Sequence, residues 1–224
     1  MSDFRRLETR IIACRCCPRL VSWREQVALE KVKRFAEEEY WGKPIPGFGD
    51  PDARLLLVGL APAAHGGNRT GRMFTGDNSG NWLYRALYKA GFSNQPLSVH
   101  RNDGLRLTDC YITATVRCAP PQNKPAPAEV SNCHPYLLEE IRLLRHVRVV
   151  VGLGKIGFEA ALKAYREIGR VEYVSRPRFA HCARYSYNEL TFIASFHPSQ
   201  QNTFTGRLTQ QMFDRVFRSA KALL

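Results

Sequence analysis

Long apolar runs and acidic residues are scarce in this sequence, and its first residues show no leader pattern. No segment approaches the roughly 18 consecutive apolar residues of a membrane-spanning helix, so we expect no membrane partner. Residues 1–10 are polar and charged, unlike the apolar core of a secretory signal. These absences predict a cytoplasmic protein.

Internal repeats and low-complexity segments are also absent. A chain of 224 residues with 44% hydrophobic content can bury a sizeable core. We therefore expect one compact domain over residues 1–224, present as a monomer.

The shortage of acid leaves the chain strongly basic. Lys and Arg number 33 against 20 Asp and Glu, which gives a formal net charge of +13. Such an excess favours a polyanionic partner, although solubility alone is an alternative explanation. The basic residues form no long block, which suits a folded binding face better than a disordered tail.

The seven cysteines are an odd number, and the expected compartment is reducing, so a disulfide framework is not expected. Cys14 and Cys17 form a C-x2-C pair, and Cys118 and Cys133 bracket a proline-rich segment. These four residues fit a four-thiolate site that would join the N-terminal arm to the body. Zinc and an iron–sulfur cluster both remain possible, with Pro18 slightly favouring iron–sulfur; buried, unligated thiols are the alternative.

Continuous apolar runs alternate with helical patterns along the chain. The runs cover residues 54–60, 110–117, 147–153 and 190–196, and the helical patterns cover 22–39, 81–90, 126–145, 155–168 and 207–224. This alternation predicts an α/β fold in three layers, with a largely parallel four-stranded sheet covered by helices on both faces.

The loop at residues 58–80 is unusually long for a connection between a core strand and a helix, which favours a functional role. It contains six glycines, which let backbone approach a ligand closely; they are Gly59, Gly66, Gly67, Gly71, Gly76 and Gly80. Its one carboxylate, Asp77, lies near Arg69, Arg72 and Phe74 in the sequence. We expect a site here.

The other strand ends support this expectation. Ligands of a parallel sheet bind outside the carboxyl ends of its strands. Residues 118–123, 152–157 and 197–199, which follow the other three strands, are rich in glycine, proline and polar side chains. We expect these ends to converge with Asp77.

Gly152-x-Gly154-x-x-Gly157 matches the dinucleotide-binding fingerprint, and Glu172 lies about 20 residues further on. A nicotinamide-dependent oxidoreductase is therefore one alternative. However, the motif falls on the third strand–helix unit, and residues 171–174 make a poor partner strand. A tight turn with close helix–strand packing is the favoured interpretation.

The individual side chains also have structural explanations. Asp77 stands just before a helical pattern, where aspartate is favoured as an N-cap, so capping and catalysis are equally supported by its position. His197, in a His-Pro-Ser strand end, could be a structural histidine, and Phe74 alone fits a core position better than a site.

Three segments together resemble a known family. They are G-L-A-P-A-A-H-G-G-N-R-T-G-R-M-F-T-G-D-N-S-G (59–80), V-R-C-A-P-P-Q-N-K-P (116–125) and S-F-H-P-S-Q-Q-N-T-F-T-G-R-L-T (195–209). They resemble the uracil-DNA glycosylase superfamily, and most of all its family 5, the type-B enzymes. The resemblance implies an α/β sandwich, excision of deaminated bases from DNA, and a [4Fe-4S] cluster on Cys14, Cys17, Cys118 and Cys133. A DNA-repair role would associate the protein with the nucleoid.

The resemblance also implies roles for single residues. Phe74 matches a phenylalanine that stacks on the extruded base. Asp77 matches an acid that stabilises the cation-like sugar and orients water, and His197 a histidine that donates to the base O2. Asn123 matches an asparagine that positions water or base.

The same match places Gly59, Ala61, Pro62 and Ser199 around the base. Ala114 stands where sister families carry the asparagine that reads uracil. Without that asparagine the site should be less selective, so we expect activity on hypoxanthine, xanthine and related lesions as well as uracil. We expect a monofunctional enzyme that leaves an abasic site; a non-catalytic iron–sulfur nucleic-acid binder is the main alternative.

Overall fold

The sheet is larger than the sequence indicates. The computed structural model describes residues 2–224, which contain one six-stranded sheet in the order β1-β3-β2-β4-β6-β5. The four predicted strands form its parallel centre: β2 (Leu55–Gly59), β3 (Cys110–Ala114), β4 (Val149–Leu153) and β6 (Leu190–Ser195).

The prediction of four strands was wrong because it missed both edges. Strands β1 (Phe48–Gly49) and β5 (Arg184–Tyr187) run antiparallel to their neighbours. β1 has only two residues, and β5 alternates exposed and half-buried side chains. Neither therefore produces the continuous apolar run by which the central strands were recognised.

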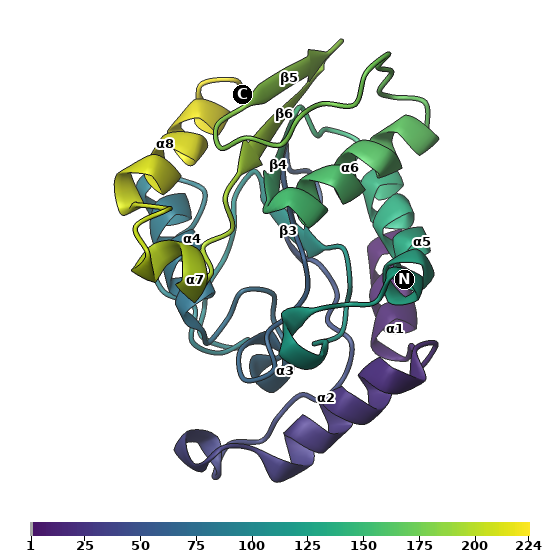
Figure 1. Cartoon of the computed structure of the whole chain (residues 1–224), viewed down its shortest axis with the longest axis vertical. Helices are drawn as coiled ribbons and strands as arrows, with labels where there is room; N and C mark the ends of the chain where they lie inside the picture. Colours follow the sequence, from purple (N-terminus) through teal and green to yellow (C-terminus); the bar gives the residue numbers. More distant parts are fainter. Residues whose placement is uncertain (1) are drawn as a thin grey trace.

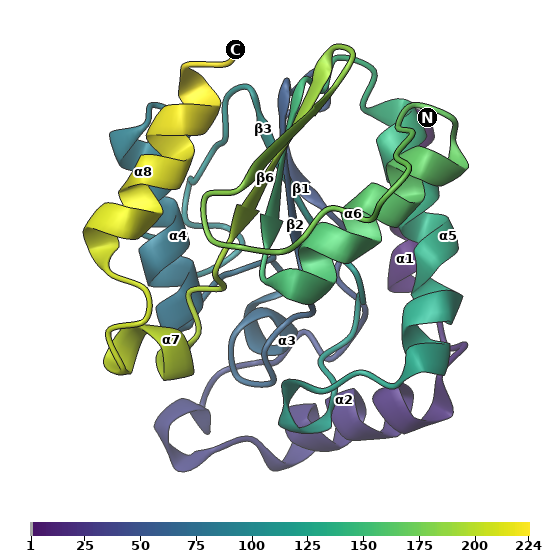
Figure 2. The same cartoon turned by 45° about the horizontal axis from the view of Figure 1, so that its top comes forward.

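Helices lie on both faces of this sheet (Figures 1 and 2). On one face α4 (Asn78–Lys89) packs against α8 (Gln210–Lys221). On the other face α6 (Lys155–Glu167) packs on β2 and β4 and against α5 (Pro127–Leu143), which in turn packs against α1 (Asp3–Ile12). The remaining helical elements are α2 (Pro18–Glu30), η1 (Lys33–Phe35), α3 (Gly67–Thr70), η2 (Pro121–Asn123) and α7 (Gln200–Phe204).

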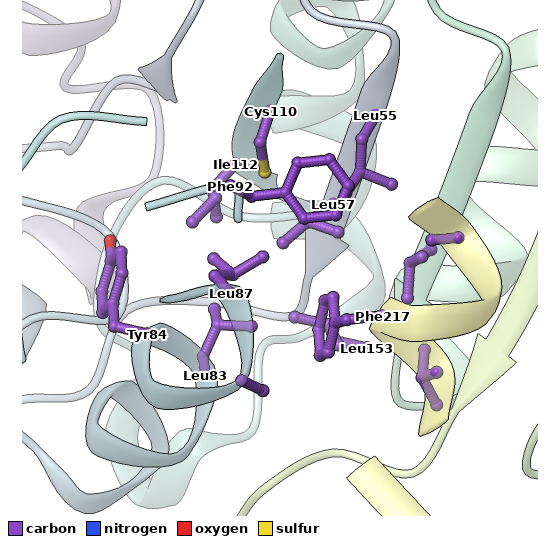
Figure 3. Packing of buried hydrophobic residues seen from close by; sticks show 14 of the residues in the cluster. Leu55, Leu57, Leu83, Tyr84, Leu87, Phe92, Cys110, Ile112, Leu153 and Phe217 are labelled. Carbon is purple, nitrogen blue, oxygen red and sulfur yellow. The ribbon is translucent and has the colours of Figure 1, made fainter. Parts of the chain in front are cut away.

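Two apolar cores follow from the alternation of side chains along each strand. Leu55 and Leu57 of β2 point toward α4 and α8, where they meet Leu83, Leu87 and Phe217 (Figure 3). The intervening residues of β2, Leu56 and Val58, pack instead with buried residues of α5 and α6. Burial on both faces explains why the central strands are apolar throughout.

The helical predictions differ from the structure mainly at the N-terminal end. The helix predicted at 22–39 begins instead at Pro18, because proline is favoured at the first helical position, and it ends at Glu30. Lys31 then has a φ of 55°, which breaks the helix. α1 was not predicted, since its apolar side chains are few among charged ones. The helix predicted at 207–224 starts at Gln210.

A buried ion pair joins the segment that follows β3 to α5. The side chains of Arg117 and Glu140 are each 1% exposed, and two Arg117 nitrogens donate to Glu140 at 3.0 and 2.5 Å. Thr113 Oγ1 and the Gly47 N–H also donate to this carboxylate. Removing one partner of such a pair costs about 3–5 kcal/mol, because the other charge stays buried. The pair therefore holds the segment entering Cys118 firmly against the helix that carries Cys133.

Within residues 2–224, none of the helices combines the length and the apolar content that a membrane crossing requires.

Candidate active site

The loops after the parallel strands meet at one end of the sheet. β2 pairs with β3 so that Gly59 lies opposite Ala114, and β4 pairs with β6 so that Leu153 lies opposite Ser195. Figures 1 and 2 show α3, which follows β2, and α7, which follows β6, at this same end. The carboxyl ends of the parallel strands therefore lie at the same end of the sheet.

Asp77 is the N-cap of α4, and its two carboxylate oxygens have different surroundings. Oδ1 accepts a hydrogen bond from the Gly80 N–H at 2.8 Å. Oδ2 lies beside Gly66, where a Cβ would come within 2.1 Å of it. One oxygen therefore caps the helix while the other lies against bare backbone, so capping and catalysis do not exclude each other.

The environment of Asp77 opposes its ionisation. Desolvation by burial raises the pKa of the carboxyl above its ordinary value, while the N–H groups of Gly80 and Ser79 and the charge of Arg69 lower it to a smaller extent. Arg69 is buried and fixes the loop by donating to the carbonyls of His65 at 2.8 Å and Gly76 at 3.0 Å. A carboxylate held in this way is poorly solvated and strongly attracted to positive charge.

Phe74 and His197 lie together although they are far apart in the sequence. Their ring centroids are 5.8 Å apart and the ring planes are inclined by 31°. Phe74 has a φ of 52° and lies against Gly59, where a Cβ would come within 2.9 Å of its ring. Glycine at position 59 is therefore what allows the aromatic ring to lie against the end of β2.

His197 is held by the turn after β4 and by α7. A Cβ on Gly154, whose φ is 87°, would lie 3.3 Å from the His197 Cβ, and Asn202 Nδ2 donates to the His197 carbonyl at 2.8 Å. Burial lowers the pKa of His197 to about 4. The imidazole is therefore neutral near pH 7 and has one N–H to donate, and it makes no side-chain hydrogen bond within residues 2–224.

The glycines of the dinucleotide-like motif all have packing explanations. A Cβ on Gly152 would lie 2.3 Å from the Phe158 Cα, and one on Gly157 would lie 2.3 Å from the Val58 carbonyl oxygen. Gly154 makes room for His197, and residues 171–174 form no strand. The interpretation as a tight turn with close helix–strand packing is confirmed by this geometry.

The remaining predicted residues lie in the loop after β2, at the end of β3, on η2 and at the start of α7. Asn123 is exposed on η2 with a φ of 57°, and its side chain has no hydrogen-bond partner among residues 2–224. Ala114 is buried at the end of β3, and Pro62 lies against Gly67. Ser199 occupies the N-cap position of α7 without a side-chain capping bond.

Two supporting residues were not recognised from the sequence. Asn202 positions the His197 backbone, and Gly66 makes room for Asp77 Oδ2. Gly66 was noted only as one of six loop glycines, because the sequence does not show which glycine faces the acid. No motif or spacing in the sequence indicated that Asn202 would support the site.

The cysteines named as ligands gather around α2. Cys17, Cys118 and Cys133 are buried in one apolar cluster with Leu20 and Val116, and Ala61 packs against it. Arg24 donates to Cys118 Sγ at 3.1 Å and to the Cys14 carbonyl at 3.3 Å, and Asn132 donates to Cys17 Sγ at 3.4 Å. Across the described part of the chain the cysteines form no disulfide. In the same residues, no three His, Cys, Asp or Glu side chains are placed to hold a single metal ion.

Comparison with known proteins agrees with this geometry. A family model described as the uracil DNA glycosylase superfamily matches residues 46–221. A type-5 uracil-DNA glycosylase of Mycobacterium tuberculosis is 52% identical over 97% of this chain and 80% of its own length. Those of Thermus thermophilus and Pyrobaculum aerophilum are 51% and 45% identical, each over 95% of this chain and over 94% and 90% of their own lengths. The chain therefore belongs to the uracil-DNA glycosylase superfamily, within its type-5 branch.

Proposed function

We propose that this chain excises uracil from DNA by hydrolysing the N-glycosidic bond, leaving an abasic site. The observation that supports this most strongly is the pairing of Phe74 with a neutral His197 at the strand ends from which the Asp77 loop also emerges. A base in a duplex is unreachable, so the nucleotide must be extruded into a pocket and stacked. The exposed excess of Lys and Arg would supply the phosphate contacts, which are independent of sequence and sensitive to salt.

Asp77 and His197 would each stabilise one of the two opposite charges that develop in the reaction. Breaking the bond leaves a cation-like sugar and an anionic base. Asp77, through the oxygen that does not cap α4, would stabilise the sugar and orient the attacking water. The neutral His197 would donate its N–H to the base oxygen as negative charge develops there, and a preorganised donor of this kind is worth about 10²–10³ in rate. Asn123, whose amide is free, would bind water or base.

The range of bases should extend beyond uracil. Ala114, buried at the end of β3, offers no hydrogen-bonding side chain to a base edge. A site discriminates strongly only when a wrong base leaves its buried polar groups unpaired. Hypoxanthine and xanthine are therefore expected substrates.

An assay with a duplex containing one uracil tests this function. We expect an alkali-labile site at the uracil and no strand break without alkali, because the product is an abasic site. The same duplex carrying hypoxanthine or xanthine should also be cleaved after alkali. Tight binding of the uracil duplex without release of base would contradict the proposal and favour a non-catalytic nucleic-acid binder.

The proposed cofactor is a [4Fe-4S] cluster on Cys14, Cys17, Cys118 and Cys133. Thiolates hold either zinc or an iron–sulfur cluster, and Cys17, Cys118 and Cys133 lie buried together in one cluster with Leu20 of α2. Pro18 directly follows Cys17, and a proline after a ligating cysteine occurs in iron–sulfur motifs, which favours the cluster over zinc. When bound, the cluster would join the N-terminal arm to the loop at 118–133.

Protein purified without oxygen should therefore be brown and contain about four irons per chain. Substituting Cys133 by serine should lower the iron content and destabilise the arm, because one thiolate is lost from a shared core. Metal analysis and visible absorbance check this prediction. Zinc alone in anaerobically purified protein would contradict it.

A further inference from the structure

Arg24 is a fully buried arginine without an adequate acidic partner. Its side chain is 2% exposed on the inner face of α2, between the buried Leu20 and Val27. Arginine is almost never buried to this extent unless it is paired. The nearest carboxylate is that of Glu25 at 3.7 Å, which is 44% exposed and already accepts two hydrogen bonds from Arg15.

The guanidinium is directed at the cysteines instead. Nη1 donates to Cys118 Sγ at 3.1 Å and Nη2 to the Cys14 carbonyl at 3.3 Å. Nε is buried and has no hydrogen-bond partner. A buried cation destabilises the fold unless an opposite charge compensates it, and a cysteine sulfur with one carbonyl supplies little such compensation outside a metal centre. The arrangement is favourable only if the group beside Arg24 is anionic.

We infer that Arg24 is the counter-charge and a hydrogen-bond donor of the iron–sulfur cluster, an inference that rests on the cluster proposed above. Four thiolates and the cluster together carry net negative charge, which a buried guanidinium offsets at short range. Hydrogen bonds and positive charge at the cluster sulfurs favour the more reduced state and raise the reduction potential. Asn132, which donates to Cys17 Sγ, is a second and uncharged donor.

Arg24 also connects this region to the catalytic loop. Its carbonyl accepts a hydrogen bond at 3.1 Å from Nδ2 of Asn68, a residue that is 1% exposed in α3. α3 begins directly after Gly66, which lies against Asp77. Because this bond uses the Arg24 backbone, replacing the side chain should affect the cluster without cutting the link to α3.

The test is the reduction potential and air stability of the cluster in anaerobically purified full-length variants. Arg24→Gln keeps a donor but removes the charge, so we expect a more negative midpoint potential by protein-film voltammetry and a several-fold shorter half-life of the visible absorbance in air. Arg24→Lys keeps the charge but loses the planar fork, so its potential should lie between those of Arg24→Gln and the wild type. Lys33→Gln, which removes an exposed positive charge on η1, is the matched control and should match the wild type.

The outcomes separate this inference from the cluster itself. A wild-type protein without iron would overturn the cluster and the role of Arg24 with it. Iron-loaded Arg24→Gln with wild-type potential and half-life would overturn the role of Arg24 alone. If Arg24→Gln fails to fold, Arg24→Lys carries the test, and an unchanged potential and half-life in that variant would overturn the inference.

Discussion

Asp77→Asn is expected to lower kcat/KM for uracil excision by about 10²–10³-fold, a typical effect of removing one electrostatic contact from a transition state. Asparagine and aspartate are equally good N-caps, so the bond from the Gly80 N–H to the side-chain oxygen should persist. Only the negative charge beside the developing sugar cation is lost. Single-turnover kinetics on the uracil duplex measure the effect.

Asp77→Ala provides the comparison that separates the two functions of this side chain. Alanine cannot cap α4, so this variant should lose about 1 kcal/mol of unfolding free energy relative to Asp77→Asn. Its catalytic defect should be at least as large, because it lacks the same charge. A near-normal excision rate in Asp77→Asn would contradict the proposed role of the carboxylate.

The need for an ionised Asp77 should also show in the pH dependence of kcat/KM. Because burial raises the pKa of Asp77, the fraction of ionised carboxylate falls at higher pH than for an ordinary aspartate. On acidification, kcat/KM should therefore begin to decrease at a higher pH than an ordinary aspartate would produce. The acid limb of kcat/KM should be absent from the residual activity of Asp77→Asn.

The parts of this site that the sequence predicts are those with a local signal. The central strands were recognised because burial on both faces leaves an apolar run, and Asp77 and His197 because they follow such runs in loops rich in glycine and proline. Strand β5 was missed because an edge strand with one face in solvent alternates instead.

The remaining features depend on contacts between distant segments. Arg24 looks like an ordinary surface residue of a charged helix until α2 is packed on Cys118. The contact between Gly154 and His197 joins two loops that meet only because β4 and β6 are neighbours in the sheet. Such contacts leave no periodicity or spacing in the sequence, so only the folded chain shows them.

Gly66→Ala is expected to reduce excision by about 10²-fold, because displacing a reacting group by about 1 Å has an effect of this size. A Cβ at this position would lie 2.1 Å from Asp77 Oδ2 and 2.9 Å from Cγ, closer than real atoms approach. The short Asp77 side chain is tied to Gly80, so it can yield only by turning its carboxylate away. Rate measurements on the folded variant check this.

Two further variants decide whether Gly66→Ala acts through Asp77. Gly91, at the other end of α4, has a φ of 76° and open space where a Cβ would lie. Gly91→Ala should therefore lose about 1–2 kcal/mol of stability from left-handed backbone strain while retaining full activity. In the double variant Gly66→Ala/Asp77→Asn the two defects should not add, because residues that act through one contact are coupled. Additive losses would mean that Gly66 supports the reaction by a route that does not include the Asp77 carboxylate.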